Sequence, residues 1–257
     1  MKFDELLNHH LLFGTQEEDI IKRRGYEKIL KNVVVAPWWS HNIFEKFGTI
    51  QRVGDNIFNV LGNNFQFSFI EIHNIGAPSI LEAILPLGIT QCEKIIFIGS
   101  VGSLDENIKI GDLVIPSCSI SGVGSTRFLS KTLEDDFEKE YYPNKKLTEN
   151  LVELIAEKYS QFNLHYCKNY SVDTIFAQFP HIDHFIKLGA QTIEMETSAL
   201  FKCCSMINVP CCAILSVSDS SLKNKSLFSG RTNEDKIKKM KTRDEIIPQI
   251  VIDLLCR

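Results

Sequence analysis

The sequence predicts an α/β protein built on a central, twisted, mixed β-sheet that is flanked by helices in a three-layer arrangement. Strand-like and helix-like segments alternate along the chain from about residue 33 onward, which is typical of this class. Three apolar runs that read as buried strands end in glycine or polar residues, at 99–102, 194–196 and 218–219. Because ligands bind at the carboxyl ends of strands in open α/β sheets, we expect these three segments to meet at one pocket.

The composition indicates a globular protein whose partner is a small molecule. With 257 residues, of which 44% are hydrophobic, the chain is long enough to bury a full core, and no proline-, serine- or glycine-rich linker divides it, so we expect one domain over residues 1–257. A net charge of −4 gives no general attraction to nucleic acid or to anionic lipid. The N-terminus carries no signal-like pattern and no stretch is apolar enough to span a bilayer, so we expect a cytoplasmic protein without membrane contact.

The cysteines of this chain predict no metal or redox centre. None of the eight forms a Cys-x-x-Cys motif, and the adjacent pairs at 203–204 and 211–212 flank a passage from helix to strand, where small buried thiols pack well. We expect reduced structural cysteines, with metal binding or redox chemistry as the alternative, and accordingly no cofactor and no metal ion.

The first part of the chain is predicted to be a helical extension followed by a strand and a hairpin. Residues 16–31 are polar and helical in pattern, and we assign residues 1–31 to the N-terminal extension. The β-branched run 33–35 predicts the first core strand. Segments 57–61 and 65–72 alternate in hydrophobicity around a Gly-Asn-Asn turn, a pattern that predicts a β-hairpin.

The remainder of the chain is predicted to alternate between helix and strand. Helices are expected at 80–87, 147–159, 197–206 and 246–255, and strands at 94–98, 112–120 and 211–217, with a glycine loop at 99–102. The segment 220–244 is rich in lysine, serine, asparagine and threonine and poor in apolar residues. We therefore expect it to lie outside the core and to form a lid beside the pocket.

Several ordered motifs resemble the superfamily of nucleoside phosphorylases and nucleosidases. The resemblance rests on Ile-Ile-Phe-Ile-Gly-Ser-Val-Gly-Ser-Leu at 95–104, Gly-Asp-Leu-Val-Ile-Pro at 111–116, His-Asn-Ile-Gly-Ala-Pro-Ser at 73–79, Ile-Glu-Met-Glu-Thr-Ser-Ala at 193–199 and Val-Ser-Asp at 217–219. It runs in order from about residue 33 to the last residue. The resemblance implies the α/β fold of that superfamily, a nucleoside as ligand, and assembly as a homodimer or homohexamer.

The resemblance also assigns chemical roles to the polar residues at the strand ends. Cleavage of an N-glycosidic bond develops positive charge on ribose and negative charge on the base, so it needs an acid for the base and oriented acceptors for the sugar. Asp219, with Ser218 beside it, would share a proton with the base at purine N7, the structural alternative being a carboxylate that caps a turn. Glu196 would accept both ribose hydroxyls, with Met195 against the sugar, or would only favour the positive end of a helix. For Glu194 a structural and a functional role are equally open.

Further wall residues follow from the same resemblance. Ser100 would offer its hydroxyl and backbone N–H to the sugar or the nucleophile, with Gly99 permitting the tight backbone, although a glycine turn without a ligand would look similar. Phe176 falls where the family places an aromatic ring against the base, and a core phenylalanine is the alternative. Ile175 and Ile75 are additional wall candidates.

The chain departs from the family where phosphorylases hold phosphate. The family places a glycine and an arginine after the first strand and an arginine before the glycine loop, whereas this chain has Trp38, Asn42 and Phe97 at those places. None of these three side chains can replace a bidentate, permanently charged guanidinium. Arg52 resembles an arginine that reaches phosphate across a dimer interface, and a solvated surface arginine is the alternative.

The nucleosidase branch of the family is not matched fully either. Its glutamate after the first strand, which positions water, has no counterpart in this chain before Glu45. His41 is the nearby group able to act as a base close to neutral pH, and Ser40 is placed to orient a water molecule. The alternative for His41 is a surface histidine at the start of a helix.

These features predict an enzyme that cleaves the N-glycosidic bond of a purine-type nucleoside, with water rather than phosphate as the nucleophile. One alternative is a nucleoside phosphorylase with a remodelled phosphate site. A second alternative is a nucleoside-binding protein without catalysis. The presence of both Asp219 and Glu196 favours an enzyme, because a binding protein has no need of an acid directed at the base.

Overall fold

The backbone of the computed structural model is organised around a single mixed sheet, and the structure describes residues 1–133, 136–222 and 225–257. Within these residues the strands are β1 (Asn32–Pro37), β2 (Thr49–Gly54), β3 (Ile57–Leu61), β4 (Gln66–Ile72), β5 (Lys94–Ser103), β6 (Leu113–Gly122), β7 (Glu140–Tyr141), β8 (Leu164–Val172), β9 (Thr192–Glu194) and β10 (Cys211–Ser220). The helices are α1 (Phe3–Leu12), α2 (Glu17–Arg24), α3 (Ala77–Ile84), α4 (Lys145–Lys158), α5 (Ile182–Lys187), α6 (Thr197–Met206), α7 (Asn233–Lys241) and α8 (Ile247–Leu255). A π-helical turn, η6 (Thr242–Ile246), connects α7 to α8.

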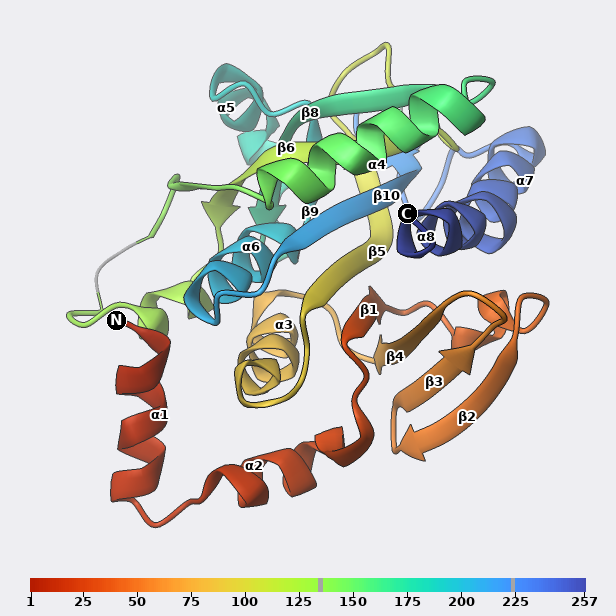
Figure 1. The fold of residues 1–257 in the computed structure, drawn as a ribbon. Helices are drawn as coiled ribbons and strands as arrows, with labels where there is room; N and C mark the ends of the chain where they lie inside the picture. Colours follow the sequence, from red (N-terminus) through yellow and green to blue (C-terminus); the bar gives the residue numbers. More distant parts are fainter. Residues whose placement is uncertain (134–135, 223–224) are drawn as a thin grey trace.

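Part of the sheet closes on itself. Strand β10 pairs with β5 on one side and with β6 on the other, and β6, β8, β9 and β5 then pair in succession. These five strands form a closed ring, while β1, β4, β3 and β2 continue outward from β5 as an open sheet (Figure 1). The predicted central mixed sheet is confirmed, and the ring is an addition that the sequence pattern did not reveal.

The open part of the sheet is covered on both faces, which explains its uninterrupted apolar strands. In β1, Val33 and Val35 belong to the core that includes α3 and α6, whereas Val34 and Ala36 belong to the core that includes α4 and α8. Side chains alternate between the two faces of a strand, so a strand buried on both faces is apolar at every position. The two helical layers of the predicted three-layer arrangement are thus present (Figure 1).

The predicted helices and the hairpin occur where the sequence places them. Strands β3 and β4 pair antiparallel, with Leu61 opposite Gln66, around the Gly-Asn-Asn turn. Helix α2 is shorter than the predicted 16–31 because Gly25, at φ 73°, ends it in the left-handed conformation. Helices α1 and α2 lie apart from the ring, next to α3, where they border an apolar cavity of about 410 Å³ (Figure 1).

Two expectations about strand ends are corrected by the structure. Residues 99–102 are not a loop but the last part of β5, and Ser218 and Asp219 are part of β10. Strands β2, β7 and β8 have no counterpart among the predicted elements. Strand β7 has only two residues, every β2 side chain is exposed or half-exposed, and β8 includes His, Lys and Asn, so none of the three has a clear apolar pattern.

Two further observations concern the thiols and the bilayer. All eight cysteines are free thiols, and every one except Cys256 is buried. No helix within the described residues has both the length and the apolar character needed to cross a membrane.

Candidate active site

The polar residues at the ends of β5, β9 and β10 line a cavity of about 260 Å³. This volume is slightly below the usual range for ligand pockets, about 300–1,000 Å³. Most of the predicted site residues line it: Asp219, Ser218, Glu196, Met195, Glu194, Ser100, Gly99, Ile175 and Ile75. Strands β1, β5 and β10 run parallel, so their carboxyl ends share one edge. Strand β9 runs antiparallel to β5 and reaches the same place because Ile193 pairs with Gly102.

The Asp219 carboxylate is aimed by an irregularity in β10. Val217 pairs with Val101 and Asp219 pairs with Gly102, so Ser218 is one extra residue in the ladder. The Ser218 hydroxyl donates to Asp219 Oδ1 at 2.5 Å and lies 3.3 Å from the Val101 carbonyl oxygen. Burial raises the pKa of Asp219, although the Ser218 hydrogen bond and the charges of Arg231 and Lys239 oppose this shift.

A group of cations beside Asp219 was missed by the sequence analysis. Lys239 and Arg243 line the cavity, and Arg231 donates to the Ser218 carbonyl oxygen at 3.4 Å and to the Leu227 carbonyl oxygen at 2.6 Å. They come from the segment 220–244, of which residues 223 and 224 lie outside the described residues. The sequence indicates this group only through the many lysines of the segment, and that composition does not predict which cation lines the cavity.

Glu194 is saturated by protein donors. Its Oε1 accepts from Asn169 Nδ2 at 2.6 Å, from the Ser171 hydroxyl at 2.6 Å and from the Thr197 hydroxyl at 2.9 Å. Its Oε2 accepts the backbone N–H groups of Glu196 and Thr197, both at 2.7 Å, at the start of α6. Burial raises the pKa of Glu194 against these hydrogen bonds. Through these hydrogen bonds Glu194 holds the backbone of Glu196 in place, and it therefore positions the Glu196 side chain.

Glu196 keeps acceptor capacity for a ligand. Its Oε1 accepts the Gly76 N–H at 2.7 Å and its Oε2 accepts the Met195 N–H at 3.2 Å, and a carboxylate has roughly four acceptor positions. Gly76 precedes α3 with φ 89°, a conformation that glycine adopts without strain. Burial and the negative charge of Glu194 raise the pKa of Glu196 to about 8. A group that donates hydrogen bonds into this corner would favour the ionised carboxylate.

The apolar wall differs in one residue from the expectation. Ile175 and Val172 line the cavity, whereas Phe176 is 88% exposed and lies outside the lining residues. Ile175 and Phe176 both lie in the irregular segment after β8, where no regular alternation fixes the side-chain direction, and Ile175 is the one that lines the cavity. Met195, which is buried, and Ile75, which is half-exposed, also line the cavity.

Two tryptophans follow β1, at the place where the resemblance predicts a phosphate site. Trp39 is buried, while Trp38 is 69% exposed and has φ 61°, an uncommon conformation for a bulky residue. Both line the cavity. Phe97 is buried in the core and Asn42 is outside the lining residues, so neither occupies the cavity.

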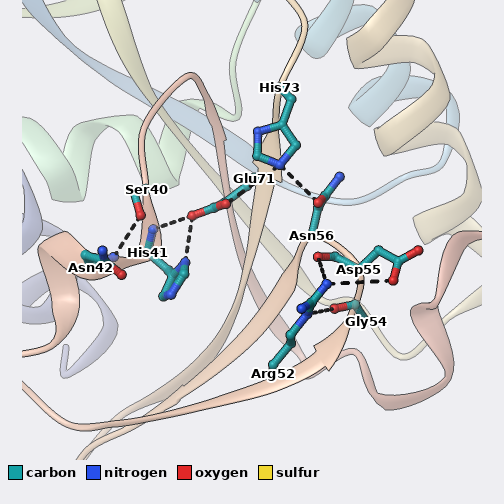
Figure 2. A network of polar contacts seen from close by, with 9 residues as sticks. All are labelled: Ser40, His41, Asn42, Arg52, Gly54, Asp55, Asn56, Glu71 and His73. Carbon is teal, nitrogen blue, oxygen red and sulfur yellow. Dashed lines mark hydrogen bonds and ion pairs between the residues drawn. The ribbon is translucent and has the colours of Figure 1, made fainter.

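His41 and Arg52 belong to a separate polar network at the edge of the open sheet (Figure 2). Glu71 accepts the His41 backbone N–H at 2.6 Å and lies 2.7 Å from His41 Nδ1, while the imidazole stacks on Phe58 with ring centroids 3.6 Å apart. Partial burial raises the pKa of Glu71, but the hydrogen bonds from His41 lower it more, so the pKa of Glu71 is below its usual value. Arg52 folds onto the carbonyl oxygens of Gly54 and Asp55, at 3.1 and 2.8 Å (Figure 2).

Neither His41 nor Arg52 lines the cavity within this chain. The ring of His41 is already engaged by Glu71 and Phe58, which accounts for its direction away from the cavity. Ser40 accepts the Asn42 N–H at 3.3 Å and caps the short turn that carries His41. The structure therefore does not bring the predicted base and the predicted phosphate ligand to the acid and the sugar clamp.

Comparisons with known proteins point to one family. A sequence model of the phosphorylase superfamily matches residues 65–246. A 5′-methylthioadenosine/S-adenosylhomocysteine nucleosidase of Buchnera aphidicola subsp. Acyrthosiphon pisum is 33% identical over 147 residues, a match that covers 51% of this chain and 58% of that protein. The match thus spans less than two thirds of the nucleosidase. A DeoD-type purine nucleoside phosphorylase of Xenorhabdus nematophila is 28% identical over 194 residues, covering 71% of this chain and 77% of that protein.

Among solved structures, uridine phosphorylase from Vibrio fischeri has a similar fold. Its TM-score is 0.75 at 18% sequence identity, and the alignment covers 89% of this chain and 92% of the phosphorylase. At this identity the likeness concerns the fold alone. All of the strand-end residues discussed above, from Gly99 to Asp219, lie inside the matched region 65–246, whereas His41 and Arg52 precede it.

Proposed function

The chain belongs to the phosphorylase superfamily, and on this basis we propose that it cleaves the N-glycosidic bond of a purine-type nucleoside with water as the nucleophile. The observation that carries the proposal is the presence of two buried carboxylates with free acceptor or proton-donating capacity, Asp219 and Glu196, in the walls of one cavity. The names of the two sequence relatives, a nucleosidase and a purine nucleoside phosphorylase, support the same class of reaction.

Asp219 is proposed as the acid that assists departure of the base. When the bond from C1′ to the base nitrogen breaks, its electron pair goes to the base, and a proton delivered to purine N7 neutralises the charge that develops there. A carboxyl group whose pKa is raised by burial carries that proton at a higher pH than an exposed one. Asp219 then regains a proton from solvent.

Glu196 is proposed as the clamp for the two ribose hydroxyls. Two of its acceptor positions are taken by the N–H groups of Gly76 and Met195, which leaves two for the vicinal donors of the sugar. Its negative charge also stabilises the positive charge that grows on the ribose as the bond breaks. Met195, beside it in the cavity wall, offers an apolar surface to the sugar.

Water is proposed as the nucleophile because the residues after β1 that line the cavity are uncharged. These residues are Trp38 and Trp39, and a phosphate dianion would need charged donors to compensate for lost hydration. Water attacks C1′ with its oxygen and releases one proton to solvent, so the products are the free base and free ribose. Phosphate attack would yield ribose 1-phosphate instead.

The test is to incubate the full chain with adenosine, inosine and their methylthio analogues, with and without millimolar phosphate, and to measure free base and the sugar product. We expect base release without phosphate, free ribose as the product, and a change of less than about threefold when phosphate is added. Release that requires phosphate and gives ribose 1-phosphate would establish the phosphorylase alternative. Thermal stabilisation by nucleosides without base release would establish the binding-protein alternative.

The acid itself is tested by Asp219→Asn, which keeps the shape of the side chain and removes its exchangeable proton. We expect turnover to fall by roughly two to four orders of magnitude, while nucleoside binding changes much less. Asp183→Asn, on the exposed face of α5, is the matched control. Near-normal turnover of the Asp219 variant would leave that residue as part of the strand irregularity only.

A further inference from the structure

Lys239 is one of the cationic residues that line the cavity together with Asp219. It lies in the last turn of α7, is partly buried, and lines the same cavity as Asp219 and Glu196. Burial, together with the like charges of Arg231 and Arg243, lowers the pKa of Lys239. The negative groups that oppose this shift are Asp219 and Asp244.

The side chains of Lys239, Arg231 and Arg243 differ in whether their hydrogen-bond donors have acceptors in the protein. Arg231 donates to two backbone carbonyl oxygens, of Ser218 and Leu227, and Arg243 forms a two-point contact with Asp244 at 2.5 and 2.8 Å. Among the residues that the structure describes, none accepts a hydrogen bond from Lys239 Nζ or pairs with it within 4 Å. Lys239, which lines the cavity, therefore has three ammonium donors with no fixed acceptor among the described residues.

The position of Lys239 fixes which part of a nucleoside it can meet. Nucleophile and leaving base must stand on opposite faces of the sugar during displacement at C1′. Lys239 lines the same cavity as Asp219, which is the acid proposed for the leaving base, and its charge acts on the pKa of that acid. Lys239 is thus placed to contact the base rather than a nucleophilic anion.

We propose that Lys239 is a specificity-determining residue that selects nucleosides whose base presents a carbonyl oxygen, such as 6-oxopurines, over those that present an amino group. This inference rests on the proposed function and names its substrate class. An ammonium group donates to a carbonyl oxygen, and the negative charge of the departing base spreads onto that oxygen. An exocyclic amino group is itself a donor and leaves the ammonium of Lys239 without an acceptor.

The test compares inosine with adenosine for the wild-type chain and for Lys239→Met, which keeps the apolar stem and removes the charge. We expect the wild type to favour inosine, and the ratio of the two kcat/KM values to fall by about ten- to a hundredfold in the variant, mainly through loss of inosine cleavage. Lys239→Arg, which keeps a donor and a charge, should retain most of the preference. Lys236→Met, an exposed lysine of the same helix, is the control that should leave both rates unchanged.

Binding of the free bases separates this inference from the proposed reaction. Calorimetry with hypoxanthine and adenine should show tighter binding of hypoxanthine by the wild type and a loss of that difference in Lys239→Met, even if no nucleoside is cleaved. Equal losses for both nucleosides and both bases, or a wild type that favours adenosine and adenine, would overturn the role of Lys239. Absence of base release from every nucleoside, with the hypoxanthine preference intact, would overturn only the proposed function.

Discussion

Gly102 lies between the two halves of the candidate site. It pairs with Asp219 of β10 on one side and with Ile193 of β9 on the other. A Cβ atom at this position would be 3.1 Å from Asp219 Oδ2 and 3.2 Å from Ile193 Cγ2, tighter than ordinary van der Waals contact. The absence of a side chain at Gly102 therefore leaves room for the carboxylate of Asp219.

We expect Gly102→Ala to lower turnover by about ten- to a hundredfold, because it displaces the acid by a fraction of an ångström. The melting temperature should change little, since the neighbouring atoms are the ends of side chains. Gly124→Ala is the control, because the Cβ there would meet its nearest neighbour, Asp173 Oδ2, at an ordinary 3.5 Å. Equal activities of the two variants would show that the close contact at Gly102 does not orient Asp219.

The two remaining acceptor positions of Glu196 lead to a prediction about the sugar. Glu196→Ala should weaken binding of ribonucleosides by about 1.5 to 3 kcal/mol and of 2′-deoxyribonucleosides by clearly less, since the deoxy sugar already lacks one donor. Titration of both nucleoside types against both proteins measures the difference. Equal losses would mean that Glu196 acts only on α6 and its neighbours, without touching the 2′-hydroxyl.

A site residue could be predicted from the sequence where the local segment alone fixes the position of its side chain. It could not be predicted where residues distant in the sequence fix that position. Asp219 and Glu196 were identifiable because strand ends and short motifs fix them locally. Lys239 was not, since helical spacing alone does not tell which lysine of a polar segment faces a cavity. Phe176 was misjudged for a related reason: it lies in an irregular segment, where no regular alternation fixes the side-chain direction, and the neighbouring Ile175 lines the cavity instead.

Helix α7 is held against the ring at one glycine. Gly111 has φ 90°, its N–H donates to the Val217 carbonyl oxygen at 2.9 Å, and its own carbonyl oxygen accepts the Thr242 hydroxyl at 2.7 Å. A Cβ atom at Gly111 would be 2.7 Å from Lys238 Cβ and 3.2 Å from the Lys238 carbonyl carbon. The close approach of α7 to the end of β10 thus depends on the missing side chain.

Gly111→Ala should lower the free energy of unfolding by about 1 to 3 kcal/mol and should also shift α7, with a higher KM as the result. Gly189→Ala separates the two causes. Gly189 has nearly the same backbone angle, φ 89°, but its Cβ would meet only Lys168 Cδ, at 3.6 Å. Urea denaturation of both variants compares their stabilities, and the change of KM should appear in Gly111→Ala alone. If both variants bind nucleosides normally, the contact with α7 does not shape the cavity.

Elements with a strong internal pattern were predictable, and those defined by their neighbours were not. The apolar period of α3, α4 and α8 and the β-branched run of β1 are local properties of the sequence. Strand β7 has two residues, too few for any period, and is defined by its pairing with β6. The closure of the ring through β10 likewise depends on pairings between residues far apart in the chain, which no local pattern encodes.

The buried carboxylates make the stability of the whole molecule depend on pH. Burial raises the pKa values of Glu194, Glu196 and Asp219, with Glu196 at about 8, so the folded state binds more protons than the unfolded chain above the usual carboxyl pKa. Stability from a raised carboxyl pKa is present at low pH and is lost as the pH rises through the folded value. Carboxyls with lowered pKa values, such as Asp253, act in the opposite sense at more acidic pH.

We therefore expect the free energy of unfolding to fall as the pH rises from about 4.5 to about 8, by up to about 1.4 kcal/mol per pH unit through Glu196. Urea denaturation at several pH values measures this slope, and Glu196→Gln should make it shallower and stabilise the protein at pH 8. A ribonucleoside should counteract the fall, because its hydroxyls favour the ionised Glu196. A slope that is identical in wild type and Glu196→Gln would contradict the raised pKa.

The closed ring also has a consequence for the order in which the molecule is assembled. Strand β10 is the last strand of the chain, it occupies the gap between β5 and β6, and it carries Asp219. During synthesis the other four ring strands emerge before β10, and until β10 pairs with β5 and β6 each of those two strands has an unpaired edge, which is prone to association with other chains. Insertion of β10 closes both edges in one event and brings the acid to the sugar clamp at the same moment. Because this closure joins segments distant in sequence, it is expected to be a slow step of folding, and catalytic activity should return together with the final protection of the β5 amides from hydrogen exchange rather than before it.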